Sequence, residues 1–589
     1  KSRTYQLPAL IRPGLTLVIS PLIALIRDQV EKLREVPGLT CVAALVSGVD
    51  AASQEEILRD AAAGRIKLLY ISPERLRDPR FRTYLEQLPL VQIVVDEAHC
   101  IATWGHDFRP DFREISRLLR TERRSLPVHA LTATAPRQVQ DEIAATLAMG
   151  TDRPFVTRPG NFQRPNLVFR EYHVDSDSER NALTLGIVHQ LVRNEAQGGA
   201  GIIYVNTRRL ATQVASMLRS ANIAAQAYHA GLPTPERHQI QERFMQGDLD
   251  VVVATKAFGM GVDKAEIRFV LHYDHPDSLE AYIQEAGRAG RDGKEAYAIL
   301  LFHRRTQHTA RFIARQGIPG RPTLTDYYQA LRDIGTAEED GVRLADGSIL
   351  CSADTPGRLA GIEPTQARIL LYAFEEVGLL RRGVDCTLEA TLLLNRPVAE
   401  IVATLDSSEE QELARQLLVY LQAEPDRQVT YQATRLYLET GIDPRQVDPL
   451  LVKLAERDGL LYRGYSRGIT YQLAQQEGPG TVRAALSAIE RTYERRYQIF
   501  EQRLEDMLDY CRMQRGQGRC RSAELVNYLT GRSDSPACGR CDLCSPDGKN
   551  LPWDSAARLY GEERVVDLFL AILSAVRDHS RFFSRGTIE

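Results

Sequence analysis

The chain has 589 residues, which is too long for one hydrophobic core and predicts about three to five domains. Its hydrophobic content of 43% and charged content of 26% are ordinary for a globular protein. No apolar run approaches the roughly 20 residues needed to cross a bilayer, which argues against a membrane-spanning protein. The formal net charge of −3 neither indicates nor excludes a nucleic-acid partner, because a balanced total can hide local basic surface.

The chain ends and the cysteines bear on targeting segments and on the redox state of the compartment. The first residue is Lys1 rather than Met, and the last residues stop without a tail, so both ends are expected to be cut. Any targeting segment would then lie upstream. Of the nine cysteines, four cluster near the C-terminus with metal-ligand spacing and five are scattered, which favours a reducing compartment over a disulfide framework.

Residues 1–160 are predicted to form a first α/β domain. Each expected strand is an apolar run that ends in a polar turn, and helical segments lie between them; the strands are 15–19, 67–71, 93–95 and 128–131. This alternation predicts a doubly wound parallel sheet. Because parallel strands present their carboxyl ends at one edge, the polar residues should converge there.

Asp96 and Glu97 end the third of these strands. In a nucleotide-hydrolysing site the first carboxylate can hold Mg²⁺, usually through water, and the second can accept a proton from the attacking water. The competing interpretation is a solvated acidic turn, since many strands end in one.

The motifs resemble those of superfamily 2 helicases, in this order and spacing: Ser20-Pro21-Leu22, Asp96-Glu97-Ala98-His99 and Thr132-Ala133-Thr134. The loop between residues 99 and 110 resembles the aromatic-rich loop of RecQ DNA helicases, which in that family couples DNA contact to ATP hydrolysis. Here Trp104 and Phe108 could stack on unpaired bases, and His106 and Arg109 could contact phosphate. A core position for Trp104 is the alternative. The resemblance also implies a DNA contact at Ser20 and a relay role for His99.

Lys1 and Ser2 match the end of a phosphate-binding loop, Gly-Lys-Ser, whose glycines would lie upstream. In such a loop Lys reaches the β- and γ-phosphates and Ser binds Mg²⁺. Their distance from Ser20 fits the family.

Residues 161–315 are predicted to form a second parallel-sheet domain, with strands at 201–205, 224–228, 251–254 and 269–273. Arg288 and Arg291 are expected on one helical face, because they are three residues apart. A second lobe can supply such cations to a γ-phosphate, as an arginine finger does; surface salt bridges are the alternative. The resemblance makes Arg291 the finger, with Gln284 and Arg288 supporting it. It also assigns DNA contact to Thr255 and nucleotide-site roles to Gly261 and Asp263. Thr255, Gly259 and Asp263 match the family segment that links DNA contact to the nucleotide site.

The stretch 316–479 contains an internal repeat. Gly361-Ile362-Glu363-Pro364 recurs 80 residues later as Gly441-Ile442-Asp443-Pro444, and each copy continues through a helix, Gly-Leu-Leu and a short expected hairpin. This pattern predicts two winged-helix-like modules, 316–400 and 401–479. The expected wing strands are 387–392 and 469–473. Arg457, Arg463 and Arg467 would give the second copy a basic wing, and DNA contact and structural packing are equally open roles for it. The insertion resembles RecQ relatives of the Rothmund-Thomson type.

Residues 480–548 are predicted to form one long amphipathic helix and a metal module. Four thiolates could surround one tetrahedral Zn²⁺: Cys520, Cys538, Cys541 and Cys544. The site resembles the structural zinc module of RecQ proteins, with Cys511 a rival for Cys520. Nearby arginines could contact phosphate: 512, 515, 519, 521 and 540. Residues 555–589 resemble the start of the winged helix that follows zinc in that family.

Together these features predict an α/β fold of two RecA-like domains followed by winged-helix-like and zinc-binding modules. The implied function is an ATP-dependent 3′ to 5′ DNA helicase in repair and recombination, with ATP, Mg²⁺ and structural Zn²⁺ as cofactors. Single-stranded, tailed or branched DNA would be the partner, and no membrane partner is expected. The resemblance also implies a single-strand-binding protein or a topoisomerase as protein partners. The implied location is the bacterial cytoplasm, at the nucleoid, or the nucleus in a eukaryote. The alternatives are an RNA helicase and a non-catalytic DNA-binding adaptor.

Overall fold

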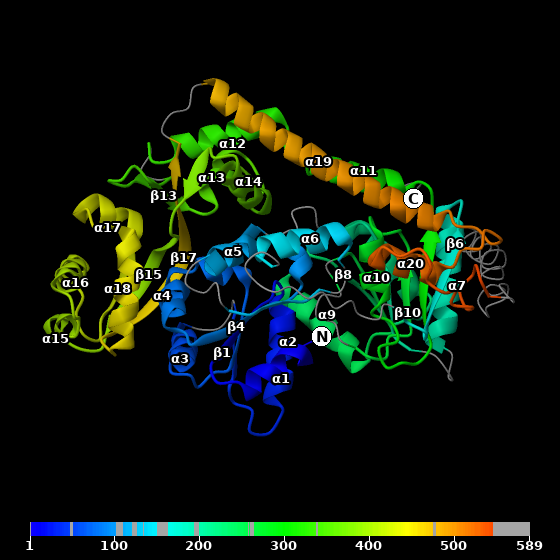
Figure 1. Ribbon diagram of the computed structural model, residues 1–589, viewed down its shortest axis with the longest axis horizontal. Coiled ribbons are helices and arrows are strands. Elements are labelled where there is room, and N and C mark those ends of the chain that lie inside the picture. The colour runs from blue at the N-terminus through cyan, green and yellow to red at the C-terminus, as the bar shows by residue number, and fades with distance from the viewer. Residues whose placement is uncertain are drawn as a thin grey trace, which may run out of the picture. The chain divides into compact units, whose positions relative to one another are not determined.

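Figure 1 shows the computed structural model of the chain, which describes residues 2–46, 51–101, 110–120, 126–132, 135–149, 163–193, 199–256, 258, 264–336, 340–474 and 479–545. The chain divides into two compact units. The first contains residues 1–133, 138–156 and 318–496, and the second contains residues 134–137, 157–317 and 497–589. Among the described helices, none combines the length and the apolar character needed to cross a bilayer.

The first lobe is built on a parallel sheet of order β2-β3-β1-β4-β5, as the sequence predicts. Its strands are β1 (Leu15–Ile19), β2 (Val42–Leu45), β3 (Leu68–Ile71), β4 (Leu90–Val95) and β5 (Val128–Ala130). Strands β1 and β3 are buried throughout, which explains their nearly continuous apolar sequence. The helices around this sheet are α1 (Arg3–Ile11), α2 (Ile23–Arg34), α3 (Ala51–Ala62), α4 (Pro79–Gln87), α5 (Arg113–Arg120) and α6 (Arg137–Thr146).

The second lobe is a six-stranded sheet of order β6-β11-β10-β7-β9-β8 in which all pairs are parallel. Its strands are β6 (Leu167–His173), β7 (Gly201–Tyr204), β8 (Ala225–Tyr228), β9 (Val251–Ala254), β10 (Phe269–His272) and β11 (Ala296–Phe302). Its helices are α7 (Asp177–Arg193), α8 (Arg208–Ser220), α9 (Thr234–Gln246), α10 (Leu279–Ala286) and α11 (Thr306–Gln316). Separate hydrophobic clusters cover the two faces of the sheet. The predicted α/β fold of two RecA-like domains is confirmed.

The insertion belongs to the first unit and forms an antiparallel sheet of order β12-β13-β17-β15-β16, with β14 paired to β17. Its strands are β12 (Val342–Arg343), β13 (Ile349–Ser352), β14 (Leu380–Arg382), β15 (Cys386–Leu394), β16 (Gln428–Gln432) and β17 (Leu460–Leu473). Its helices are α12 (Arg321–Asp333), α13 (Thr355–Leu359), α14 (Pro364–Glu376), α15 (Val398–Ala403), α16 (Ser408–Tyr420), α17 (Ala433–Thr440) and α18 (Pro444–Glu456). Two hydrophobic cores lie along this one sheet, one for each repeat.

The two repeats exchange their third strands. In the first repeat β13 and β14 pair with the C-terminal part of β17, as in Ile349 with Tyr471. In the second repeat β16 and the N-terminal part of β17 pair with β15, as in Leu460 with Leu394. The expected hairpin within each repeat is therefore wrong: strand 386–394 completes the second repeat, and 469–473 completes the first.

The glycines of β17 explain this error. Gly464 and Gly468 lie where a hairpin would need its turn, but neither has a positive φ angle, so the strand runs on for 14 residues. A Cβ at Gly464 would lie 2.7 Å from Thr387 Cγ2, and one at Gly468 would lie 2.7 Å from Leu388 Cδ2. Both glycines therefore make room for side chains of β15 instead of turning the chain.

Helix α19 (Pro479–Cys511) confirms the predicted long helix, with 33 residues. Leu486, Ile489 and Tyr493 belong to the hydrophobic core of the first repeat. Leu504 and Leu508 belong to a core of the second lobe, together with helix α20 (Arg521–Thr530). The helix thus contributes one end to each unit.

Candidate functional site

The carboxyl ends of β1, β4 and β5 bring the predicted first-lobe residues together. The Asp96 amide donates to the Ile19 carbonyl at 2.9 Å, and the Ala98 amide donates to the Leu131 carbonyl at 2.8 Å. The Glu97 backbone has a positive φ of 48°, a conformation that is uncommon outside glycine and often found at functional sites. Its amide donates to Asp96 Oδ1 at 3.0 Å, which orients the Asp96 carboxylate against the Glu97 backbone.

His99 joins this group from the 3₁₀ helix η2 (Ala98–Ile101). Its Nδ1 atom lies 3.0 Å from Thr132 Oγ1 and 3.3 Å from Glu97 Oε2, and the ring is almost fully buried. A histidine held between a carboxylate and a hydroxyl can transmit a proton or a change of position between them. The predicted convergence of the strand ends is confirmed at Glu97, His99 and Thr132.

Sequence reasoning missed a polar cluster beside Asp96. Gln6 Nε2 lies 3.1 Å from both the Tyr70 hydroxyl and Gln29 Oε1, and the Tyr5 and Tyr70 hydroxyls lie 3.4 Å apart. Burial raises the pKa of Tyr70, and the charge of Asp96 adds to the increase. These phenols therefore stay neutral beside the carboxylate. Their only sequence signal is polar residues within otherwise apolar segments.

Several predicted site residues lie outside the described residues: Lys1, Trp104, His106, Phe108, Arg109, Gly261 and Asp263. Ser2 is described, and its carbonyl accepts the Tyr5 and Gln6 amides at the start of α1. Ser20 is 2% exposed, and the Thr255 amide donates to the Tyr228 carbonyl at 3.2 Å. The DNA contacts expected at Ser20 and Thr255 stay predictions.

The second-lobe arginines do not share a helical face, contrary to the prediction. Helix α10 ends at Ala286, so Gln284 lies on it, whereas Arg288 and Arg291 lie in the turns that follow. Gly287 ends the helix, and Gly290, with a φ of 61°, reverses the chain between the arginines. Arg288 is buried and Arg291 is exposed. The turn therefore presents one guanidinium to the outside and keeps the other within the lobe.

Arg164 and Asn166 hold this turn, and no motif or spacing in the sequence points to them. Arg164 donates to the carbonyls of Ala289 and Gly290 at 2.8 and 3.0 Å, and Asn166 donates to the Gly290 carbonyl at 2.7 Å. A Cβ at Gly290 would lie 2.6 Å from Asn166 Nδ2. Burial and the nearby Arg291 charge lower the pKa of Arg164. The turn is thus positioned by side chains that precede β6.

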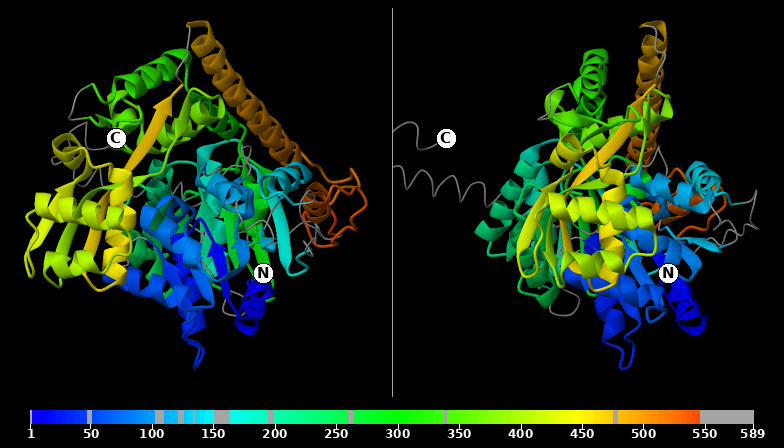
Figure 2. Two further views of the ribbon diagram at one scale, coloured as in Figure 1. Left: turned by 60° about the vertical axis from the view of Figure 1, so that its left-hand side comes forward. Right: turned by 90° about the vertical axis from the view of Figure 1, so that its left-hand side faces the viewer.

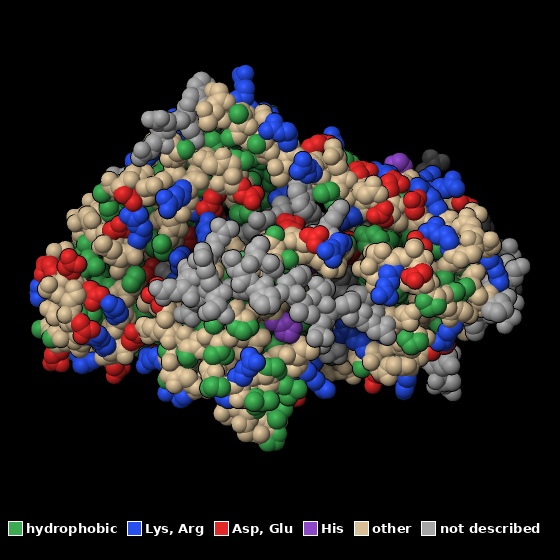
Figure 3. All heavy atoms as spheres, in the orientation of Figure 1, with side chains coloured by type: hydrophobic (Ala, Val, Ile, Leu, Met, Phe, Trp, Pro, Cys, Tyr) green, Lys and Arg blue, Asp and Glu red, His purple; other side chains and the backbone are tan. Residues whose placement is uncertain are grey.

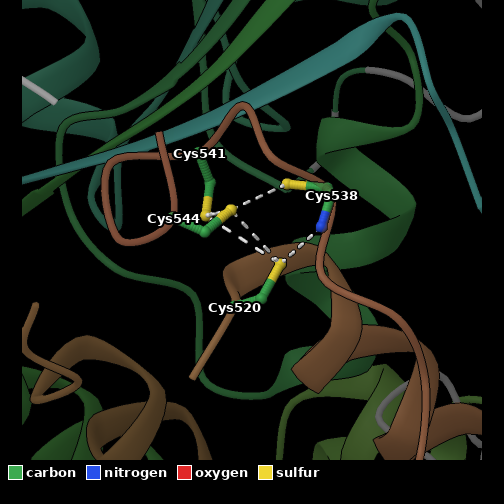
Figure 4. Close-up of side chains that lie close together, drawn as sticks. All are labelled: Cys520, Cys538, Cys541 and Cys544. Atoms are coloured by element: carbon green, nitrogen blue, oxygen red, sulfur yellow. Dashed lines mark hydrogen bonds between the residues drawn. The ribbon is translucent and has the colours of Figure 1, made fainter. Parts of the chain in front are cut away.

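The four predicted cysteines come together in the second unit (Figure 4). Their sulfur atoms are separated by 3.3 Å (Cys541 to Cys544), 3.6 Å (Cys538 to Cys544), 3.9 Å (Cys544 to Cys520) and 4.0 Å (Cys541 to Cys520). Four sulfurs at about 2.3 Å from one tetrahedral ion would lie roughly 3.8 Å apart, so the donor set fits such an ion. Cys511, the rival ligand, instead lies in the hydrophobic core, where burial raises the pKa of its thiol.

Arg521 ties this cysteine cluster to the sheet of the second lobe. It is 2% exposed and makes ion pairs with Glu171 of β6 at 2.7 Å and with Asp542 at 3.0 Å. The His173 Nε2 atom lies 2.9 Å from the Cys511 carbonyl oxygen. Two ion pairs on one buried guanidinium show that Arg521 has a structural role here.

The basic residues expected to contact phosphate near the cluster all have protein partners. Arg512 pairs with Glu505 and Asp509, Arg519 with Glu524, and Arg540 with Glu295, and Arg515 donates to the Ser545 carbonyl. In the insertion, Arg457 pairs with Asp406 and Arg467 with Asp385. On the face drawn in Figure 3, acidic and basic side chains lie intermingled over the insertion.

The helix that would enter DNA in a winged helix packs on protein in the second repeat. Helix α18 lies against α4 of the first lobe (Figures 1 and 2). The Arg80 guanidinium lies over the Tyr462 ring at 5.6 Å, which adds a cation–π contact between the same two parts. Of the two roles left open for this copy, structural packing is therefore the one that the contacts favour.

Two family descriptions match the chain: "DEAD/DEAH box helicase" over residues 1–142 and "Helicase conserved C-terminal domain" over residues 184–293. ATP-dependent DNA helicase RecQ of Bacillus subtilis is 41% identical over 319 residues, covering 54% of this chain and 51% of its own. ATP-dependent DNA helicase Q5 of Mus musculus is 40% identical over 326 residues, covering 54% and 33%. "Probable ATP-dependent DNA helicase RecS" of Bacillus subtilis is 35% identical over 397 residues, covering 67% and 75%. The chain spans only a third to about half of the first two relatives but three quarters of the last.

Proposed function

Because this chain belongs to the RecQ family of superfamily 2 helicases, we propose that it is an ATP-dependent DNA helicase. ATP hydrolysis would drive movement 3′ to 5′ along a single strand and unwinding of the duplex ahead, in repair and recombination. The observation that carries the proposal is the arrangement of Glu97, His99 and Thr132 at the carboxyl end of a parallel sheet. The alternatives, an RNA helicase and a non-catalytic adaptor, are decided by the experiment below.

In the first lobe, the residues that would hold ATP and Mg²⁺ are Lys1, Ser2 and Asp96. The bound Mg²⁺ supplies charge neutralisation for the phosphates. Glu97 would orient the attacking water and take its proton, and the turn at φ 48° sets the direction of its carboxylate. His99 contacts both Glu97 and Thr132, so it would report a change at the carboxylate to the strand end that follows β5.

In the second lobe, the exposed Arg291 would act as the arginine finger and the buried Arg288 would hold the turn in place. Gln284, partly buried on α10, would support them. Gly261 and Asp263 would belong to the nucleotide site, and Thr255 and Ser20 to the DNA path. Trp104, His106, Phe108 and Arg109 would contact single-stranded DNA. Each assignment rests on the family motifs.

In the metal module, the four cysteines would hold Zn²⁺ in a structural role. Four thiolates leave no open position for a substrate, which fits that role. Soluble partners such as single-strand-binding protein or a topoisomerase, and a location in the bacterial nucleoid or the nucleus, follow from family resemblance.

The test is ATP hydrolysis with no nucleic acid, with single-stranded DNA and with single-stranded RNA. We expect strong stimulation by DNA and little by RNA. Glu97→Gln should abolish hydrolysis while nucleotide binding stays nearly unchanged, because only the proton acceptor is lost. Glu56→Gln, an exposed change on α3, is the matched control. Hydrolysis by Glu97→Gln at the wild-type rate would remove Glu97 from catalysis, and stronger RNA stimulation would favour the RNA helicase.

A further inference from the structure

A buried ionic cluster joins the insertion to the first lobe. Asp385, directly before β15 and fully buried, pairs with Arg382 at 2.9 Å and with Arg467, and lies 4.0 Å from Arg77 of the first lobe. Arg77 ends the 3₁₀ helix η1 (Pro73–Arg77) and pairs with Glu114 of α5. Burial would raise the pKa of Asp385, but the three guanidinium charges hold it below its usual value.

Beside this cluster lies a cavity of about 330 Å³. Four arginines and two aspartates supply its charged groups: Arg77, Arg368, Arg382, Arg467, Asp111 and Asp354. The rest of its wall is largely apolar or aromatic and includes Leu371, Tyr372 and Ile469. Its volume is in the range of sites for small organic ligands, and this combination of guanidinium groups with apolar wall suits a group that is part phosphate and part ring.

Two of these arginines have hydrogen-bond donors to spare. Arg382 donates to Asp385 through Nη2, but its buried Nε has no acceptor among the described residues. Arg368 is exposed on α14, and no carboxylate within the described part of the chain pairs with it. Burial, followed by the nearby charge of Arg382, lowers the pKa of Arg77 to about 10, as expected where positive charge is crowded. The cavity therefore offers donors that an incoming anion would satisfy.

One wall of the cavity also follows closely in the sequence after the segment that is predicted to contact DNA. Asp111 belongs to the 3₁₀ helix η3 (Pro110–Phe112), two residues after Arg109, and α14 packs on η3. In the sequence, the aromatic-rich segment that is expected to contact single-stranded DNA is thus followed at once by η3, which contributes Asp111 to the cavity wall.

We propose that this cavity binds one nucleotide unit of a DNA single strand, with Arg368 and Arg382 on the phosphodiester and Tyr372 and Leu371 beside the sugar or base. The inference rests on the proposed function and extends it to the insertion. Four guanidinium groups against two aspartates give the lining an excess of two positive charges. Glu114 and Asp385 behind it balance that excess. Such a site favours a singly charged phosphodiester over the more highly charged free phosphate, because spare donors rather than net charge would hold the anion.

The first experiment measures binding of the full chain to fluorescein-labelled oligo(dT) over a series of NaCl concentrations. Log K falls with log[salt], and Arg368→Gln should make this negative slope shallower by about 0.7, the value for one phosphate contact on a single strand. The control is Arg381→Gln on β14, whose side chain is exposed and points to the opposite face from Arg382. Thermal melting should show that both variants remain folded.

A second measurement cross-links 4-thiothymidine oligonucleotides to the wild-type chain, with the cross-linked peptides identified by mass spectrometry. We expect a cross-linked peptide within α14 that Arg368→Gln weakens several-fold. An unchanged salt slope, or cross-links without an α14 peptide, would overturn the subsite while wild-type DNA binding and DNA-stimulated ATP hydrolysis leave the proposed function intact. If calorimetry shows inorganic phosphate binding that depends on Arg368 while the DNA slope stays unchanged, the site takes a free anion and the proposal is wrong. Absence of DNA binding by the wild type would overturn both.

Discussion

Replacing Asp385 by Asn should loosen the insertion, because the carboxylate is fully buried among three guanidinium groups. Removing one partner of a buried ion pair costs about 3–5 kcal/mol, since the remaining charges stay buried without compensation. Asn keeps the size and one acceptor oxygen, so we expect the lower end, about 3 kcal/mol. This corresponds to local opening that is about two orders of magnitude more frequent.

Hydrogen exchange of the full chain measures this effect peptide by peptide. Amides of β15 and β17 should exchange about 100-fold faster in Asp385→Asn, whereas β6 in the second unit serves as an internal reference. Asp406→Asn, which loses an exposed ion pair with Arg457, should leave the rates unchanged. Because the folded pKa of Asp385 lies below its usual 3.8, its stabilisation is present above that pH and is lost as the pH falls through the folded pKa. Equal exchange in the variant and the wild type at neutral pH would refute the stabilising role of the ionic cluster around Asp385.

Two further predictions concern the second unit. Gly290→Ala should lower DNA-stimulated ATP hydrolysis tenfold or more, because its Cβ displaces the arginine turn. Gly293→Ala should have a much smaller effect, because this glycine has a φ of 81° but nothing lies within 4 Å of the new Cβ. Equal losses of activity in the two variants would contradict the clash. Cys541→Ser should lose about one equivalent of zinc, measured by atomic absorption on the purified chain, whereas Cys41→Ser should retain it; full zinc content in Cys541→Ser would rule out the four-cysteine site.

The position of Asp96 and Glu97 at a strand end could be predicted because its signal is local. The apolar run of β4 ending in Asp96 and Glu97 specifies a buried parallel strand, and every such strand delivers its end to one edge. The arginine turn shows where local reasoning fails. Spacing alone placed Arg288 and Arg291 on a helix, although Gly287 before them and Gly290 between them were the signal for its end.

The exchanged strands and the supporting side chains depend on pairings between distant residues. Thr387 to Leu392 has the same alternating pattern whether it pairs within its own repeat or with the other, so the sequence could not choose. Arg164 contacts a turn more than 120 residues away, and Arg77 approaches Asp385 from another domain. Nothing in the neighbouring sequence of either arginine marks its partner.

The exchange of strands also determines when, during synthesis, the first repeat can complete its sheet. Strand β14 has been synthesised once the ribosome reaches Arg382, but its partner segment in β17 is complete only at Leu473, about 90 residues later. At roughly 5–20 residues per second, the ribosome takes on the order of 5 to 20 s to supply that partner. During this interval the edges of β13 and β14 are open to other chains. The first repeat of the insertion therefore stays incomplete until the second repeat has been made, and a chain cut between the repeats would keep those edges open permanently.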